Sequence, residues 1–153
     1  MSGKGFTLIE MMIVIAIIGI LSVVAVFGWQ GYQNNLNLKT AAGEVMSDIA
    51  SCKQRAISEG IQYCMQFTND SPNYSINAAS CDAPTDTQAK ILTSFGSGLT
   101  VRSANFGIFG QELSFIPRGT ITAGRVILAN SKGSIATITT TVTGRTHVSF
   151  AMQ

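Results

Sequence analysis

Charged side chains are scarce in this sequence, and histidine and proline are rarer still. Only 12% of the 153 residues are Asp, Glu, Lys or Arg, whereas 46% are hydrophobic, and the mean hydropathy is +0.30. This balance argues against a disordered polar chain and is typical of a membrane-associated or sparsely charged extracellular protein. The length suits one domain of ordinary size and not two.

The residues that most enzymes and metal sites depend on are also few. His147 is the only histidine, so the nearby motifs assemble neither a two-histidine metal site nor a Ser-His-Asp arrangement. The three cysteines lack the C-x-x-C spacing of zinc sites. The glycines at 107 and 110 lack the lysine of a phosphate-binding loop. We therefore predict no enzyme, no catalytic residue, no metal and no cofactor.

One long apolar run begins near the N-terminus and contains neither proline nor a basic residue. Residues 6–27 number 22, and at about 1.5 Å per residue they would span the roughly 30 Å hydrocarbon core of a bilayer. Lys4 precedes the run and little basic charge immediately follows it, which places the N-terminus in the cytoplasm. A secretory signal peptide is less well supported, because no small-x-small cleavage site precedes a polar start.

Glu10 is the unexpected residue of this segment. A carboxylate at the edge of an apolar span is costly in lipid and needs a partner, and nothing basic lies within a helical turn on its C-terminal side. Cleavage between Gly5 and Phe6 would create a new α-amine near Glu10. That amine could pair with Glu10 of the same or a neighbouring helix, so that the acid would set the register of assembly. A plain signal anchor does not explain Glu10.

The run Gly5-Phe6-Thr7-Leu8-Ile9-Glu10, followed by apolar residues, resembles the class III signal of type IV prepilins and type II secretion pseudopilins. The resemblance implies cleavage after Gly5 by a prepilin peptidase, N-methylation of Phe6, and docking of Glu10 onto other pilins or pseudopilins. It also implies a single pass through the bacterial inner membrane, with the C-terminal domain in the periplasm, before entry into a filament. Major pilins usually carry a proline near the end of the run, so its absence favours a minor pilin or pseudopilin.

Beyond the apolar run the sequence becomes polar but keeps a helical period. One apolar stripe recurs at spacings of three and four residues: Leu38, Ala42, Val45, Ile49, Cys52 and Ala56. Gly60 follows as a C-cap. We predict one helix from about Phe6 to about Glu59. After a cleaved leader at 1–5, residues 6–27 would form its transmembrane or filament-core half, and residues 28–59 its amphipathic half.

Residues 60–153 are predicted to form a β-rich globular head. Residues 61–67 alternate in polarity, and the turn cluster at 69–73 leads into residues 74–77, which predicts a hairpin. Residues 80–88 are predicted to be a polar loop. Further strands are predicted at 91–95, 99–102, 113–116, 119–123, 125–129, 134–141 and 145–151. The fold class is α+β, a long N-terminal helix packed on a C-terminal antiparallel β-sheet, which is the type IV pilin fold.

Three segments beyond the apolar run carry a second resemblance. The helix end at 55–60, the run at 113–119 and the pair Gly144-Arg145 are similar to the family of H-type pseudopilins and T/U-type minor pilins (GspH/FimT). This resemblance implies a structural subunit of a type IV pilus or type II secretion pseudopilus, acting in filament initiation or at the tip.

Charge is distributed unevenly along the chain beyond the apolar run. Residues 28–86 hold three basic and six acidic side chains, whereas residues 87–153 hold six basic and one acidic. An anionic partner of the distal part is therefore a reasonable hypothesis. Some T-type members of the resembled family bind DNA for natural transformation through Gly-Arg-x-Arg, of which residues 144–147 match the glycine and the first arginine. The candidate DNA-binding residues are Arg118, Arg125, Lys132, Arg145 and His147. For Arg145 and His147 the alternative is that they are solvated strand residues or contact a neighbouring subunit.

Three cysteines in an exported domain predict one disulfide and one free thiol. Cys52 lies on the apolar stripe, which favours a buried thiol. Cys64 and Cys81 flank the predicted hairpin, and their pairing would close a loop of about 17 residues and stabilise the fold by about 3 kcal/mol. Pairing of Cys52 with Cys64 is the alternative.

Overall fold

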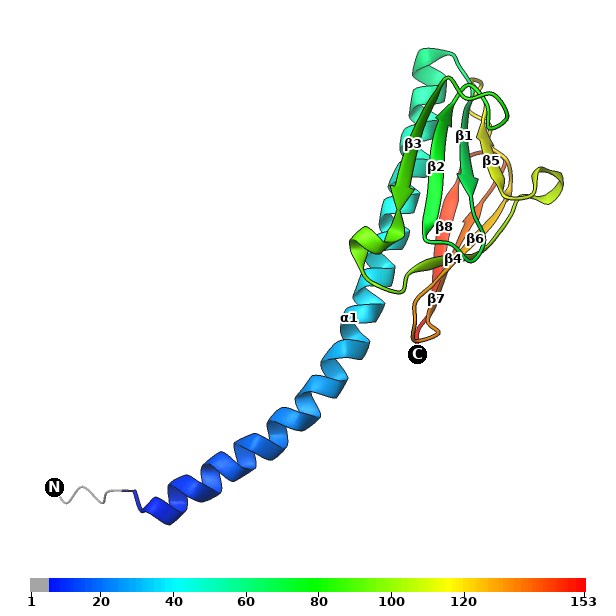
Figure 1. Ribbon diagram of the computed structural model, residues 1–153. Helices are drawn as coiled ribbons and strands as arrows, with labels where there is room; N and C mark the ends of the chain where they lie inside the picture. The colour runs from blue at the N-terminus through cyan, green and yellow to red at the C-terminus, as the bar shows by residue number, and fades with distance from the viewer. Residues whose placement is uncertain (1–5) are drawn as a thin grey trace. The chain divides into compact units, whose positions relative to one another are not determined.

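The computed structural model describes residues 6–153, with the side chains of residues 24–28 excepted. The chain has two compact units, an N-terminal unit that ends at Gln33 and a head unit, Asn34–Gln153. One long helix, α1 (Leu8–Glu59), begins in the first unit and ends in the second (Figure 1). Thr7 caps the start of α1, because its Oγ1 accepts a hydrogen bond from the N–H of Glu10 at 3.3 Å. Gly60 follows the end of α1 with a φ of 70°, which suits a C-terminal cap. The single helix predicted from the sequence is confirmed.

Within the head unit, α1 buries one face. All six residues of the predicted apolar stripe are no more than 2% exposed. Their side chains belong to one buried cluster with residues from both β-sheets of the head. The helix and the strands therefore share a single core. The buried residues of this cluster all lie between Leu38 and Ile138, and therefore inside the head unit. A chain that begins at Asn34 retains all of them.

The strands form two four-stranded antiparallel sheets rather than one. The first has the order β3 (Asp86–Ile91), β2 (Asn73–Ala78), β1 (Tyr63–Phe67), β5 (Glu112–Phe115). The second has the order β4 (Thr100–Asn105), β6 (Gly124–Ala129), β7 (Ile135–Thr140), β8 (Thr146–Ala151). The division arises because β5 pairs with β1, from Tyr63 opposite Phe115 to Gln66 opposite Glu112, while β4 pairs with β6. The α+β class is thus confirmed, and the β-layer is split.

The predicted hairpin is present as β1 and β2, with Cys64 opposite Asn77. Three other predicted segments differ from the structure. Residues 91–95 were expected as a strand, but Leu92–Phe95 form a 3₁₀ turn, η1. The hydroxyl of Ser94 donates to the carbonyl of Ile91 at 2.7 Å, a local bond that favours a turn over a sheet ladder.

The segment at 119–123 is not a strand either, since only one isolated bridge, Phe115 opposite Ile121, joins it to a sheet. Gly119 has a φ of 84°, which interrupts extended backbone. Conversely, the end of the predicted loop at 80–88 belongs to β3. Most side chains of that strand are exposed, so it carries no apolar alternation by which the sequence could reveal it.

Candidate functional site

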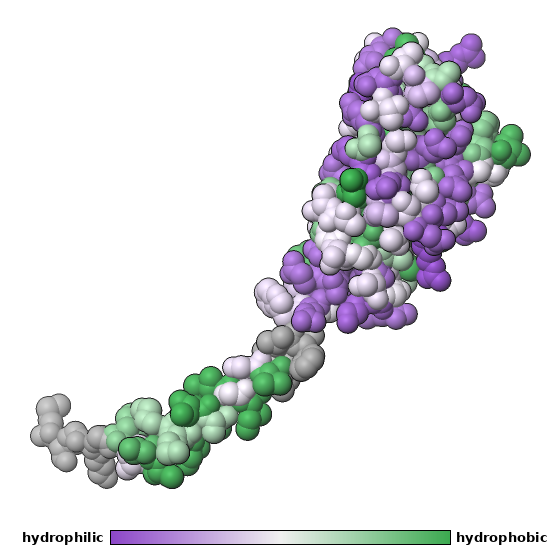
Figure 2. Space-filling view, viewed as in Figure 1, coloured by the Kyte–Doolittle hydropathy of each residue, from purple (hydrophilic) through white to green (hydrophobic). Residues whose placement is uncertain are grey.

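Apolar side chains cover the N-terminal unit and are exposed on it. The exposed fraction is 79% at Leu8, 66% at Ile15 and 43% at Val14. Figure 2 shows this unit as a predominantly hydrophobic surface. Contiguous exposed apolar surface of this kind indicates a segment that is covered by other molecules when the protein works. Within the described residues, no helix meets the combined requirements of length and hydropathy for crossing a membrane.

Glu10 lies in the first turn of α1, among these apolar residues. The positive end of the helix dipole favours a carboxylate at this position. Among the described residues, Glu10 forms no ion pair. Phe6 is 71% exposed, while Gly5 on the other side of the predicted cleavage site lies outside the described residues. An acid at the end of an exposed apolar helix is suited to meet a cation supplied by another group.

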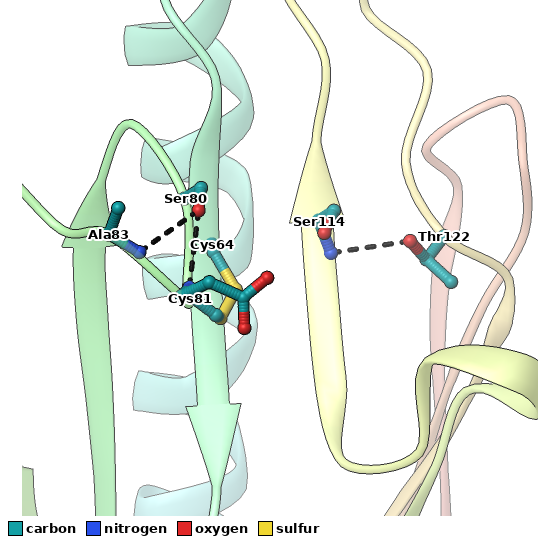
Figure 3. The surroundings of a disulfide bond; sticks show 7 residues. Cys64, Ser80, Cys81, Ala83, Ser114 and Thr122 are labelled. Carbon is teal, nitrogen blue, oxygen red and sulfur yellow. Dashed lines mark hydrogen bonds between the residues drawn. A yellow bond between two sulfur atoms is a disulfide. The ribbon is translucent and has the colours of Figure 1, made fainter.

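The disulfide in the structure joins Cys64 to Cys81, whose Cα atoms are 5.5 Å apart. Figure 3 shows it beside the turn that follows β2, where the hydroxyl of Ser80 accepts the N–H groups of Asp82 and Ala83 at 3.1 and 3.3 Å. The carboxylate of Glu112 lies within 4.8 Å of both sulfurs, in a grouping that could hold a metal ion if the cysteines were reduced. Because both sulfurs are bonded to each other, they offer no thiolate ligands.

Cys52 is free and buried. Burial, and then the nearby charge of Asp48, raise the pKa of its thiol to about 12. A thiol that stays protonated at neutral pH is a poor nucleophile, so Cys52 serves as an apolar core residue.

A polar cluster that the sequence did not reveal ties the first sheet to α1. The ammonium group of Lys90 on β3 donates to Glu44 and to Asp48, in each case at 3.3 Å. The hydroxyl of Tyr74 on β2 donates to the other oxygen of Asp48 at 2.7 Å. Burial, and then the hydrogen bond to Asp48, raise the pKa of Tyr74. Because Lys90 follows a segment that the sequence predicts as a loop, the sequence does not predict this pairing.

The five candidate DNA-binding residues divide into separate groups. Arg125, Thr139 and His147 form one row across β6, β7 and β8, and Arg145 directly precedes β8 at the same end of the sheet. Lys132 lies in the turn between β6 and β7 at the opposite end, about 17–20 Å away along a six-residue strand.

Arg118 lies in the turn after β5, not in the row. That turn leads to Ile121, whose N–H donates to the carbonyl of Val142 in the β7–β8 connection at 3.2 Å. Arg118 is therefore at the same end of the head as Arg125, Arg145 and His147, and only Lys132 is remote from the others.

Comparisons with known proteins agree with the motif at the N-terminus. Residues 1–26 match the model of the prokaryotic N-terminal methylation motif. A fimbrial protein of Pseudomonas aeruginosa is 41% identical over 73 residues, which are 48% of this chain and 47% of the relative. A type IV major alpha-pilin of Moraxella bovis is 32% identical over 91 residues, 60% of this chain and 57% of the relative. The chain thus spans about half the length of the curated relatives it matches.

Solved structures with a similar fold include two minor subunits. The minor pseudopilin EpsH from the type 2 secretion system of Vibrio cholerae aligns with a TM-score of 0.60 and 14% identity, over 74% of this chain and 96% of that one. The type IV minor pilin FimU of Pseudomonas aeruginosa aligns with a TM-score of 0.56 and 17% identity, over 77% and 92%. At such low identity the likeness shows the fold alone, which is the type IV pilin fold.

The N-terminal motif adds sequence evidence to the similarity of fold. With the methylation motif at residues 1–26 and the pilin fold in the head, the chain resembles type IV pilins and pseudopilins at both ends. The resemblance inferred from Gly5 to Glu10 is thereby confirmed.

Proposed function

We propose that the protein is a structural subunit of a type IV pilus or a type II secretion pseudopilus, and not an enzyme. The observation that carries this proposal is the placement of Glu10 in the first turn of a helix whose apolar side chains are exposed along the N-terminal unit. A helix of this kind can be covered by lipid before assembly and by the helices of neighbouring subunits afterwards. The role would be structural, because the apolar helix packs against the helices of neighbouring subunits while the head stays exposed.

Processing and assembly are linked in this proposal through one charge. A prepilin peptidase would cut between Gly5 and Phe6, and Phe6 would then be methylated on its new amino group. That amine would be the counter-charge of Glu10 on the same or a neighbouring helix. An unpaired acid in apolar surroundings is strongly unfavourable, whereas a paired one is tolerated, so subunits docked out of register would be rejected.

The proposed location follows from the same segment. Before assembly, residues 6–27 would anchor the chain in the bacterial inner membrane, with the N-terminus in the cytoplasm and the head in the periplasm. The support is the 22-residue apolar run of the sequence, with Lys4 before it. A minor subunit, in initiation or at the tip, is favoured over a major one because the run lacks proline.

Intact-mass spectrometry of the protein purified from its host tests processing. The expected species lacks residues 1–5 and carries one methyl group on Phe6. A protein that sits in a filament with its first five residues intact would contradict the proposal.

A variant tests assembly separately. Glu10→Val should be processed normally but should enter filaments at least about tenfold less, because an amine left without its counter-charge typically costs about 3–5 kcal/mol. Glu10→Asp, which keeps the charge, is the matched control. Immunoblots of sheared filaments and membranes would measure the incorporated fraction, and equal incorporation of Glu10→Val and the parent would refute the pairing.

A second candidate function is DNA binding by a pilus-associated subunit for natural transformation. The observation that favours it is the grouping of Arg125, Arg145 and His147 at one end of the second sheet. A gel-shift of the head unit with duplex DNA over a series of salt concentrations would test it, since phosphate contacts weaken steeply with salt. Arg145→Ala should weaken binding, and Lys132→Ala, at the opposite end, is the control. Absence of salt-sensitive binding by the parent head would exclude this function.

A further inference from the structure

A loop between β4 and β5 displays an isoleucine to solvent. Ile108 is 95% exposed, which exceeds the exposure of any large hydrophobic residue in the described part of the N-terminal unit. Figure 2 shows a hydrophobic projection where this loop leaves the head. Burial of such a side chain against another molecule releases free energy that folding of the head alone does not provide.

The loop holds Ile108 in a defined conformation. Residues Gly107–Phe109 form a 3₁₀ turn, η2, closed by a hydrogen bond from the N–H of Phe106 to the carbonyl of Gly110 at 2.8 Å. The N–H of Gly107 donates to the side chain of Asn105 at 2.9 Å. Gly107 and Gly110 have φ values of 67° and 61°, which glycine adopts without strain. The exposed side chain is therefore presented by an organised turn, so that little ordering is needed on binding.

An apolar cavity of about 550 Å³ lies directly beside the loop. Phe109, Ile116 and Val142 line it and are 50%, 46% and 57% exposed. Ile108 and Ile121 also contribute to its walls. The surface thus combines a projecting apolar residue with a hollow large enough for another side chain, the arrangement typical of a docking site for a protein segment.

Cationic side chains flank the cavity. Arg118 lies in the turn between two lining residues, Ile116 and Thr120. A second cavity of about 460 Å³ shares Gly107 and Ala123 with the first and is lined by Arg125. Among the described residues, neither arginine forms an ion pair. The acid nearest in the chain is Glu112, two residues before the lining residue Ser114. The flanks therefore carry net positive charge.

We propose that this surface, formed by the loop at 107–110, the apolar cavity and the two arginines, docks a segment of a different protein that carries apolar side chains next to a carboxylate. An apolar side chain of the partner would fill the cavity against Phe109, and its carboxylate would reach Arg118 or Arg125. Paired with a carboxylate, each guanidinium gains a charge-assisted hydrogen bond in a partly desolvated groove. The proposal goes beyond filament assembly through α1, because it concerns the head alone.

Two other occupants fit the surface less well. A symmetric contact between two copies of this face would bring the arginines of both copies together, and like charges at an interface are strongly unfavourable. An anionic membrane could receive Ile108 and contact the arginines, but a bilayer offers no side chain to fill the hollow beside the loop. A protein segment can cover Ile108, fill the hollow and pair with the arginines at the same time.

Site-specific photo-cross-linking of the full chain in its host tests the proposal. The photoreactive residue p-benzoyl-phenylalanine replaces Ile108 in one variant and Ile91 in the control. Ile91 is also a large exposed hydrophobic residue, 52% exposed, but it lies on β3 at the far edge of the first sheet. The expected result is a discrete cross-link from position 108, absent from position 91, to a peptide of another protein that contains apolar residues beside Asp or Glu.

Charge reversal then tests the arginines. Adding Arg118→Glu and Arg125→Glu to the position-108 variant should reduce the cross-linked yield at least about tenfold, a loss of roughly 1.4 kcal/mol in docking free energy. The charge-conserving pair Arg118→Lys and Arg125→Lys should retain most of it. Circular dichroism of the variants verifies that the head is folded.

Any of four results would overturn the proposal: no cross-link from position 108, an equal product from position 91, a cross-link to a second copy of this chain, or a partner peptide without acidic residues. A separate measurement tests binding to a membrane. If the head unit co-sediments with vesicles of phosphatidylglycerol and phosphatidylcholine, and Ile108→Ser abolishes that binding, then the surface binds lipid and the proposed protein partner is wrong.

Discussion

The two halves of α1 contain similar residues and have opposite surroundings. Ile49, in the head unit, is 2% exposed, whereas Ile15, in the N-terminal unit, is 66% exposed. Val45 and Val14 differ in the same way, at 0% and 43%. Helix formation alone therefore does not bury an apolar side chain. Burial depends on whether a complementary surface is supplied, and within the head unit the strands supply one to the C-terminal half of α1.

The sequence of each half explains the difference. In the head unit the apolar residues form one stripe and polar residues fill the other faces, so the helix has a single side to pack on the strands. From Met11 to Val23 in the N-terminal unit, apolar residues are found on all sides of the helix. A helix that is apolar all round requires apolar surroundings on every side, which only lipid or several neighbouring helices can provide.

The largest expected effect comes from removing one buried side chain of the head half. Ile49→Ala should lower the free energy of unfolding by about 2–5 kcal/mol, through lost burial and the cavity left behind. Ile15→Ala, the matched substitution in the N-terminal unit, should leave the stability of the head unchanged. Denaturant titration of both full-length variants in detergent, followed by the fluorescence and circular dichroism of the head, would measure this. Equal destabilisation by the two variants would show that the two halves of α1 do not differ in how they stabilise the head.

The disulfide provides the next largest effect, again confined to the head. Replacing Cys64 and Cys81 together by Ala should cost about 3 kcal/mol, the chain-entropy value for a loop of 17 residues. Thermal melts of the head unit with and without the substitutions would measure the loss. Cys52→Ala is the control for general loss of a cysteine, and a double variant as stable as the parent would show that the bridge contributes nothing.

The helix was predictable from the sequence because its signals are local. The apolar stripe has a fixed spacing, and the β1–β2 hairpin has a turn cluster between its strands. The split into two sheets was not predictable, because it depends on β5 pairing with the distant strand β1, with Gln66 opposite Glu112, instead of with its neighbour β4. Pairings between distant segments leave no periodic signal in either one.

The functional residues also divide into those marked by a local sequence signal and those that depend on contacts between distant segments. Glu10 could be singled out because an acid within an apolar run is conspicuous in the sequence itself. The partners of Lys90 could not be foreseen, since Glu44 and Asp48 meet it only after β3 has been placed beside α1. In the sequence, Ile108 is only one of two apolar residues between the glycines at 107 and 110. Its exposure is a property of the folded head, and nothing in the local sequence distinguishes it from a core residue.

The smallest expected effect concerns the buried face of α1 alone. The pKa of the Cys52 thiol is raised by burial from an ordinary value of 9.0 to about 12. Between these values the unfolded chain loses a proton that the native protein keeps, so the contribution of Cys52 to the free energy of unfolding is fully present below pH 9 and decreases as the pH rises toward 12. The decrease attributable to Cys52 should be about 1.4 kcal/mol per pH unit.

Cys52→Ala removes this contribution, and its alkaline loss of stability should be correspondingly shallower than that of the parent. Denaturant titrations at several pH values between 8 and about 11, on the parent and Cys52→Ala, would give the two slopes. Tyr74 also resists deprotonation in the folded head and destabilises both proteins above about pH 10, so the informative quantity is the difference between the slopes. Parallel slopes would mean that the thiol ionises as readily in the folded head as in the unfolded chain. Position 52 would then not be sealed from water, and the contrast between the two halves of α1 would be weaker than the burial of its stripe indicates.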